Sequence, residues 1–218
     1  MKIVTPDYDR PERCGIPEVV YGEYKTVEDL IEIAHDFIGK MGRFIATKVS
    51  GAAASEFIKR VGLEGSEVVY HDKARVIVAR KKGFTVSETG SIGIITAGTS
   101  DVPIAEEARV IAVELGCIVT SSYDIGIAGV HRLFPALKEM SGVKAIIVVA
   151  GMEGALPALV SGLVDVPVIG VPTSVGYGVG KGGRAALNTM LNSCTPVAVV
   201  NIDNGYGAAV LAYQIARL

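Results

Sequence analysis

The chain has little cysteine, and the few cysteines it has are isolated. Cys14, Cys117 and Cys194 are the only three in 218 residues, and none of them has the short spacing to another that a zinc site requires. An odd number of widely separated cysteines also argues against a disulfide framework. We expect Cys117, in the apolar run GCIVTS, to be a core residue and Cys14, in a polar lead-in, to be incidental. Cys194 is the thiol to be weighed.

An excess of basic charge and a long apolar run are also missing. Lys and Arg number 21 and Asp and Glu number 23, so the net charge is −2 and nothing favours nucleic acid. No run of 18 apolar residues is free of breakers, and the start MKIVTPDYDRPER lacks the hydrophobic core of a signal peptide. Half of the residues are apolar, which is ample for a core. We predict a cytoplasmic protein that binds neither nucleic acid nor membrane.

From Ile92 onward, short apolar runs alternate with segments of helical length. The runs are rich in Val and Ile and almost continuously apolar, as expected for strands covered on both faces. They are IGIITAG (92–98), CIVTS (117–121), AIIVVAG (145–151), VPVIGVP (166–172) and PVAVVNI (196–202). Repeated strand–helix units predict an α/β fold with a doubly wound parallel sheet.

The first 90 residues have a different pattern. We predict strands at 17–22 and 44–49, helices from Thr26 to about Gly39 and over 50–61, and a hairpin within 67–80. The polar, glycine-bearing segment 81–91 separates the two patterns. The sequence therefore predicts a smaller amino-terminal α/β domain over 1–90 and a catalytic domain over 91–218.

The loops after the five predicted strands are rich in polar residues and glycine. They are TAGTSD (96–101), SSYDIGIAGVHRLF (121–134), AGMEGALP (150–157), PTSVGYGVGKGGR (172–184) and NIDNGYG (201–207). Parallel strands end at one edge of their sheet, and ligands bind beyond that edge. We therefore predict one ligand site formed by all five loops.

Each candidate in these loops also has a plainer interpretation. Thr99, Ser100 and Asp101 open a helix and suit a ribose or phosphate, although Ser and Asp also serve as ordinary helix caps. His131 and Arg132 suit an anion, although a lone histidine is often structural.

The third and fourth loops hold further candidates. Glu153 follows a buried strand, where desolvation would raise its pKa for acid–base work, or it complements a helix dipole. GYGVGKGGR imitates a dinucleotide-binding fingerprint, but the residues from Pro172 to Tyr177 intervene between strand and glycines. We expect a glycine loop in which Lys181 and Arg184 meet phosphate.

Cys194 follows a predicted helix (183–192) and precedes the last strand. It should therefore lie near the amino end of that strand, at the edge opposite the predicted site. Spacing alone favours a structural thiol. A catalytic role would require a bent loop or a neighbouring subunit.

Several linked motifs resemble one enzyme family over most of the chain. They are RCGIPEVVYGEYKT (13–26), TAGTSD, YDIGIAGVHR, VVAGMEGALPALVSGL, VPVIGVPTSVGYG, ALNTMLNSC and VVNIDNGYGAA. This pattern resembles the pyridinium-3,5-biscarboxylic acid mononucleotide synthases of nickel-pincer cofactor biosynthesis. The carboxyl-terminal half is similar in turn to the aminoimidazole ribonucleotide (AIR) carboxylases and mutases of purine synthesis. Those enzymes do not share the Asn-Ser-Cys motif.

The resemblance implies a flavodoxin-like three-layer fold and a specific reaction. The enzyme would carboxylate nicotinic acid adenine dinucleotide at pyridine C5 and hydrolyse its phosphoanhydride. CO2 or bicarbonate would be the co-substrate, Mg²⁺ would assist at the pyrophosphate, and the chain would form an octamer. Asp101 and Asp203 are candidate Mg²⁺ ligands.

The resemblance also implies roles for individual residues. Cys194 would add to the ring as a nucleophile, and Glu153 would remove the C5 proton or orient the hydrolytic water. Substrate contacts are expected from Thr99, Ser100, Asp101, His131, Arg132, Ser174, Lys181, Asn201, Asp203 and Asn204. Two other readings stay open: an AIR carboxylase or mutase, and a dinucleotide-binding module without catalysis.

Overall fold

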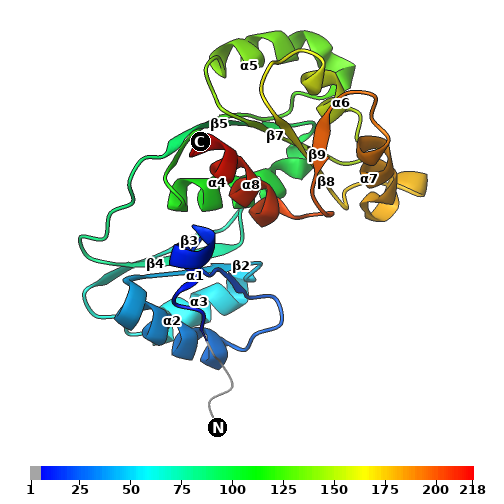
Figure 1. The fold of residues 1–218 in the computed structure, drawn as a ribbon. Coiled ribbons are helices and arrows are strands. Elements are labelled where there is room, and N and C mark those ends of the chain that lie inside the picture. Colours follow the sequence, from blue (N-terminus) through cyan, green and yellow to red (C-terminus); the bar gives the residue numbers. More distant parts are fainter. Residues whose placement is uncertain (1–5) are drawn as a thin grey trace. The chain divides into compact units, whose positions relative to one another are not determined.

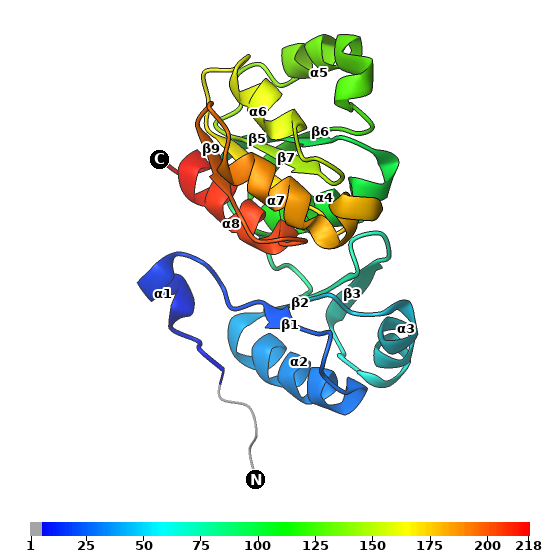
Figure 2. The same cartoon turned by 90° about the vertical axis from the view of Figure 1, so that its right-hand side faces the viewer.

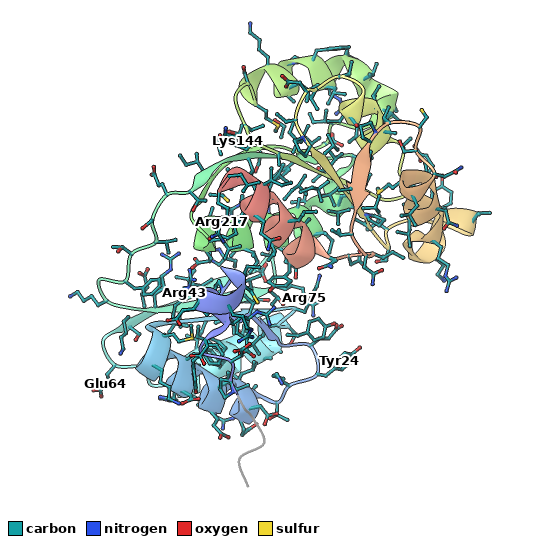
Figure 3. The ribbon with its side chains drawn as sticks, viewed as in Figure 1. Tyr24, Arg43, Glu64, Arg75, Lys144 and Arg217 are labelled. Atoms are coloured by element: carbon teal, nitrogen blue, oxygen red, sulfur yellow. The ribbon has the colours of Figure 1, made fainter. Side chains whose placement is uncertain are left out.

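The computed structural model describes residues 6–218, which form two compact units (Figure 1). The first unit ends at Thr85 and the second begins at Val86, a few residues before the predicted boundary. Side chains fill the space between the sheet and the helices of each unit (Figure 3). Over residues 6–218, no helix has the length and apolar character needed to cross a membrane.

The amino-terminal unit is a four-stranded sheet with helices packed against it. Its strand order is β1-β2-β4-β3, with β1 parallel to β2 and the other pairs antiparallel. The strands are β1 (Val20–Tyr21), β2 (Arg43–Thr47), β3 (Ser66–His71) and β4 (Val76–Lys81), and the helices are α1 (Arg10–Cys14), α2 (Val27–Met41) and α3 (Gly51–Arg60). The predicted strands, helices and hairpin are confirmed. Helix α1 was not predicted.

Local sequence signals fix the main helix of this unit. Helix α2 begins with a reciprocal cap, in which the Asp29 N–H donates to Thr26 Oγ1 and the Thr26 N–H donates to Asp29 Oδ2, both at 3.1 Å. It ends at Gly42 in the left-handed conformation. Its buried face supplies Phe37 to a core in which Phe44 and Phe57 stack with ring centroids 5.8 Å apart.

The carboxyl-terminal unit is a three-layer structure around a five-stranded parallel sheet of order β6-β5-β7-β8-β9. The strands are β5 (Gly90–Thr96), β6 (Cys117–Ser122), β7 (Ile146–Ala150), β8 (Val168–Pro172) and β9 (Val197–Val199). Helices α4 (Val102–Glu114) and α8 (Gly205–Ala216) pack together on one face (Figure 2). The other face carries α5 (Leu133–Glu139), α6 (Leu156–Ser161) and α7 (Arg184–Leu191). The predicted doubly wound sheet is confirmed.

The strand order reverses between β5 and β7. From β5 the chain crosses to β6 on one side, and from β6 it returns to β7 on the other side of β5. The connections that leave β5 and β7 therefore diverge, which opens a crevice beyond their carboxyl ends. This topology places the ligand site.

Strand β9 is shorter than predicted for a physical reason. The Asn201 side chain accepts a hydrogen bond from the Ile202 N–H at 2.9 Å, and Asp203 has φ of +55°. Both features turn the chain out of the extended conformation. Cys117 is buried, as predicted, and burial raises the pKa of its thiol to about 11.

We expect Ile94→Ala to destabilise the protein by about 2–5 kcal/mol, because Ile94 in β5 is 0% exposed and its truncation leaves a cavity. Ile118→Ala in the neighbouring strand β6 is the matched control, since Ile118 is 54% exposed and should cost less than about 1 kcal/mol. Urea unfolding followed by circular dichroism measures both. Equal losses in the two variants would contradict the assigned core.

Candidate functional site

A cavity of about 550 Å³ lies beyond the carboxyl ends of β5 and β7, where the strand order reverses. Its walls come from the loops after four strands, within residues 97–101, 126–128, 150–156 and 175–177. Of the predicted site residues, Ser100, Asp101 and Glu153 line it. Four of the five predicted strand-end loops therefore meet at one cavity, and the loop after β9 does not line it.

The charge of the cavity wall is acidic. Asp101 and Glu153 carry the charges, Ser100 and Tyr177 add hydroxyl groups, and most other lining residues are apolar or glycine. Among the described lining residues none is Lys, Arg or His. A positive group in the ligand is therefore favoured inside the cavity, and a phosphate is favoured outside it.

Asp101 is the fixed acid of the site. Its side chain is buried, with 4% of the residue exposed, and its Oδ1 accepts a hydrogen bond from Thr173 Oγ1 at 2.7 Å. Its Oδ2 accepts from the Gly98 N–H at 2.9 Å. Burial raises the pKa of Asp101, and the nearby charge of Asp203 adds to the effect. The bond to Thr173 joins the loop after β5 to the loop after β8.

Asp101 has a capping role and also contacts the loop after β8. Its bond from the Gly98 N–H caps the 3₁₀ turn Thr99–Asp101, which leads into α4, whereas α4 itself begins at Val102 without a side-chain hydrogen bond at its cap. The bond from Thr173 goes beyond capping. Ser100 and Thr99 are both exposed. Ser100 forms part of the cavity wall, and Thr99 does not.

Glu153 stands on a tight turn after β7. Met152 and Gly154 on either side have φ of +55° and +68°. A side chain at Gly151 would come within 2.4 Å of the Val175 carbonyl oxygen, so this backbone approach requires glycine. Glu153 itself is exposed. The prediction that burial prepares it for acid–base work is therefore wrong for the chain alone; a ligand or a second subunit would have to exclude the water.

Non-glycine residues with positive φ gather at this edge of the sheet. In residues 86–218 they are Asp124, Met152 and Asp203, in the loops after β6, β7 and β9. Each such residue costs roughly 1–3 kcal/mol and persists only where surrounding contacts impose it. The concentration of strain beside the cavity supports a functional role for these loops.

Arg132 is held by an ion pair within the loop after β6. Its Nη1 lies 2.9 Å from Asp124 Oδ2, and the Asp124 N–H donates to Thr96 Oγ1 at the end of β5 at 3.0 Å. Arg132 and the neighbouring His131 are both exposed and do not line the cavity. An exposed ion pair of this kind contributes little to stability.

The polar cluster after β9 mainly organises its own backbone. Asp203 Oδ1 accepts from the Ser174 N–H at 2.8 Å, which links the loops after β8 and β9. Asn204 Oδ1 caps helix α8 by accepting from the Gly207 N–H at 2.8 Å. Asn201 bonds its own loop, as described above. These residues lie beside the cavity and are not part of its wall.

The glycine-rich loop does not form a dinucleotide fingerprint. Gly178–Gly183 forms a short, irregular 3₁₀ segment in which Lys181 and Gly182 are not helical. Helix α7 begins at Arg184, well after strand β8 has ended at Pro172. The fingerprint requires a tight strand–turn–helix, so its absence agrees with the sequence interpretation. Lys181 is exposed and lies outside the cavity wall.

Cys194 lies at the opposite edge of the sheet. It is exposed, in the loop between α7 and the amino end of β9. That loop is held by hydrogen bonds from Thr195 Oγ1 to the Ala158 carbonyl at 3.0 Å and from Ser161 Oγ to the Pro196 carbonyl at 2.8 Å. These bonds hold the loop at that edge, away from the cavity of its own chain.

No ready-made metal centre is present in residues 6–218, where no group of three or more His, Cys, Asp or Glu side chains is placed to hold an ion. Magnesium typically takes one or two carboxylates and completes its shell with phosphate oxygens and water. Asp101 and Asp203 both already accept hydrogen bonds within the fold, Asp101 from Thr173 and the Gly98 N–H and Asp203 from the Ser174 N–H. Any Mg²⁺ would thus depend on the phosphates of a ligand.

The fold and the site define a flavodoxin-like α/β protein with its ligand crevice at the strand-order switch. Residues 91–218 match the family model described as AIR carboxylase, and residues 1–82 match the one described as LarB/PurE-like N-terminal domain. The chain belongs to the AIR carboxylase family.

Several curated proteins are similar to the chain. An uncharacterized protein of Methanocaldococcus jannaschii is 46% identical over 97% of this chain and 83% of its own length. An N5-carboxyaminoimidazole ribonucleotide mutase of Pyrococcus horikoshii is 35% identical over 59% of this chain and 73% of its own length. The corresponding mutase of Thermotoga maritima is 34% identical over 57% of this chain and 73% of its length. The relatives support a carboxylase- or mutase-type enzyme.

Sequence reasoning missed Thr173, Tyr177 and Asp124. Thr173 is fully buried and fixes Asp101, Tyr177 lines the cavity, and Asp124 holds Arg132. All three lie in the polar strand-end loops, which was the available signal. The partner of Thr173 comes from another loop, 72 residues away, so spacing along the chain does not reveal it.

We expect Asp101→Asn to flatten the pH dependence of stability. The folded state keeps the Asp101 proton to a higher pH than the unfolded state, because burial raises its pKa. Its contribution to stability is therefore present at low pH and is lost as pH rises from about 4 through the raised value. Urea unfolding between pH 4 and 8 measures this slope. A steeper fall in Asp101→Asn than in the parent would contradict the assignment.

Proposed function

We propose that the protein carboxylates the pyridinium ring of nicotinic acid adenine dinucleotide at C5 and hydrolyses its phosphoanhydride. The products are pyridinium-3,5-biscarboxylic acid mononucleotide and AMP, the former a precursor of the nickel-pincer cofactor. The observation that carries the proposal is the combination of two family matches in one chain. An AIR carboxylase domain follows a LarB/PurE-like amino-terminal domain, and the Asn192-Ser193-Cys194 motif lies within the former.

The chemistry explains why a thiol is needed. A pyridinium ring is electron-poor, so its C5 does not attack CO2. When the Cys194 thiolate adds to the ring, a carbon–sulfur bond forms and the ring becomes a neutral enamine with a nucleophilic C5. That carbon forms a bond to CO2. Loss of the C5 proton and departure of the thiolate then restore the aromatic ring.

Glu153 is our candidate for the group that accepts the C5 proton. It stands at the wall of the cavity on a turn that the fold imposes. A carboxylate works as a base when water is excluded around it. In this proposal, bound substrate and a neighbouring subunit provide that exclusion. An alternative role for Glu153 is to orient the water that cleaves the phosphoanhydride.

The remaining residues bind the substrate by charge and hydrogen bonding. His131, Arg132 and Lys181 lie outside the acidic cavity and suit the phosphates or the ring carboxylate. Asp101 and Asp203 are assigned to ribose hydroxyls, from which a carboxylate can accept, and hydrogen bonds to ribose or phosphate are assigned to Thr99, Ser100, Ser174, Asn201 and Asn204. Bound Mg²⁺ would neutralise charge on the pyrophosphate during hydrolysis. Asp101 and Asp203 are the candidate side chains to hold it.

The position of Cys194 requires more than one subunit. It lies at the edge of the sheet opposite the cavity. We therefore propose a homo-oligomer, an octamer by family resemblance, in which one chain supplies the cavity and another supplies the thiol. This arrangement removes the conflict between the motif and the geometry.

The second candidate function is an AIR carboxylase or mutase. The named mutases to which the carboxyl-terminal domain is similar favour it. Such an enzyme would convert aminoimidazole ribonucleotides and would not need a thiol. A dinucleotide-binding module without catalysis would bind the dinucleotide and release no AMP. One assay with both substrates separates these possibilities.

We expect the parent protein, given the dinucleotide, Mg²⁺ and ¹³C-labelled bicarbonate, to release AMP and a mononucleotide with one added labelled carboxylate. Cys194→Ser should lower the rate of carboxylation at least a thousandfold, because serine is a poorer nucleophile and leaving group than cysteine. Mass spectrometry of the products measures both. Cys117→Ser is the control for loss of a thiol. A Cys194→Ser chain as fast as the parent would contradict the proposal.

We expect mixtures of Cys194→Ser and Glu153→Gln chains to recover activity after dissociation and reassembly. If one site uses Glu153 of one chain and Cys194 of another, a random mixture contains some intact sites. At equal amounts, roughly a quarter of the sites should be intact if subunits combine at random. A mixture that stays as inactive as its components would place both residues in one chain.

A further inference from the structure

Tyr177 lines the cavity and leaves its side chain open to a ligand. The residue is 77% exposed although it forms part of the wall, and no hydrogen bond or ring contact of its side chain is found among residues 6–218; its backbone carbonyl accepts from the Gly180 N–H at 3.0 Å. Its hydroxyl and ring are not used to stabilise the fold. A large aromatic side chain in this position is available for recognition.

The backbone fixes the place of Tyr177 relative to the catalytic candidates. The Met152 N–H donates to the Val175 carbonyl at 3.0 Å, which joins the loop after β7 to the loop after β8. Tyr177 lies two residues beyond Val175, and Glu153 directly follows Met152. Glycines at 176 and 178 flank Tyr177, and Gly178 has φ of +56°. The loop that carries Tyr177 is thus tied to the loop that carries Glu153, and within its own loop the Gly180 N–H donates to the Tyr177 carbonyl at 3.0 Å.

The charges around Tyr177 favour a particular kind of ligand ring against its side chain. The charged residues of the wall are Asp101 and Glu153, and among the described lining residues no cation competes for the aromatic face. The face of a tyrosine ring attracts cations through its quadrupole. A flat cationic heterocycle would be attracted both by the face of the tyrosine ring and by the two carboxylates. A neutral ring gains stacking but not the electrostatic attraction.

We propose that Tyr177 stacks on the cationic pyridinium ring of the substrate and is a specificity-determining residue of the cavity. This inference rests on the proposed function, because a pyridinium substrate is assumed. It adds that the cavity distinguishes a positively charged ring from a neutral ring of the same outline. The carboxylate on the substrate ring then points away from Asp101 and Glu153, toward the basic residues outside the cavity.

The test compares two ligands that differ in ring charge. Oxidised nicotinic acid adenine dinucleotide has a pyridinium ring, whereas its reduced form has a neutral dihydropyridine ring and the same adenosine and phosphates. Binding is measured by isothermal titration calorimetry without bicarbonate or Mg²⁺. All proteins carry Cys194→Ser, so that no covalent adduct with the oxidised ring contributes. The readout is the ratio of the two dissociation constants.

We expect Tyr177→Leu to reduce the preference for the oxidised form by roughly five- to thirtyfold, the range that corresponds to a cation–π contact of about 1–2 kcal/mol. Tyr177→Phe should keep the preference within about twofold, since it retains the aromatic face. Both variants should fold, because the residue is exposed, and thermal melting checks this. AMP binding, measured in parallel, should not change.

Several results would overturn the inference. Tyr177→Leu could weaken both forms equally, or weaken AMP to the same degree, and the ring would then stack on adenine. It could leave the ratio unchanged and alter the size of the oligomer in gel filtration, and Tyr177 would then be a subunit contact. Binding of the oxidised dinucleotide to the Cys194→Ser protein is measured first. If this protein does not bind it, both the proposed function and this inference are overturned.

Discussion

The reversal of strand order between β5 and β7 is the constraint on which the site depends. It forces the connections after these two strands apart, and the cavity occupies the space between them. The remaining loops close the walls through hydrogen bonds between loops. Thr173 donates to Asp101, and the Ser174 N–H donates to Asp203. Loops that would be mobile alone are thereby held in one arrangement.

Negative and positive side chains lie in different parts of the candidate site. The cavity is acidic, with Asp101 buried and Glu153 exposed at the wall, and the candidate cations His131, Arg132 and Lys181 stand outside it. A molecule with a cationic ring at one end and phosphates beyond it fits this order of charges. A dinucleotide with a pyridinium ring has this distribution, so the charges agree with the proposed substrate, on which the inference about Tyr177 rests.

The two residues of the proposed catalytic pair lie at opposite edges of the sheet. Glu153 stands at the carboxyl edge and Cys194 at the amino edge. Parallel strands keep these edges a strand length apart, and hydrogen bonds hold the loop that carries Cys194 at the amino edge. An enzyme built in this way gains activity only on assembly, and exposure of both residues in the single chain is consistent with that requirement.

The sequence by itself determined the strand–helix alternation, the parallel sheet and the edge at which ligands bind, because apolar runs and helical spacing report local structure and burial directly. It also placed Cys194 at the wrong edge for its own chain. Only the tertiary structure showed that Asp101 is the buried acid and Glu153 the exposed one, contrary to expectation for Glu153. It likewise revealed Thr173, Asp124 and Tyr177 as parts of the site. Exposure and hydrogen-bond partners are set by loops distant in the sequence, and no local pattern encodes them.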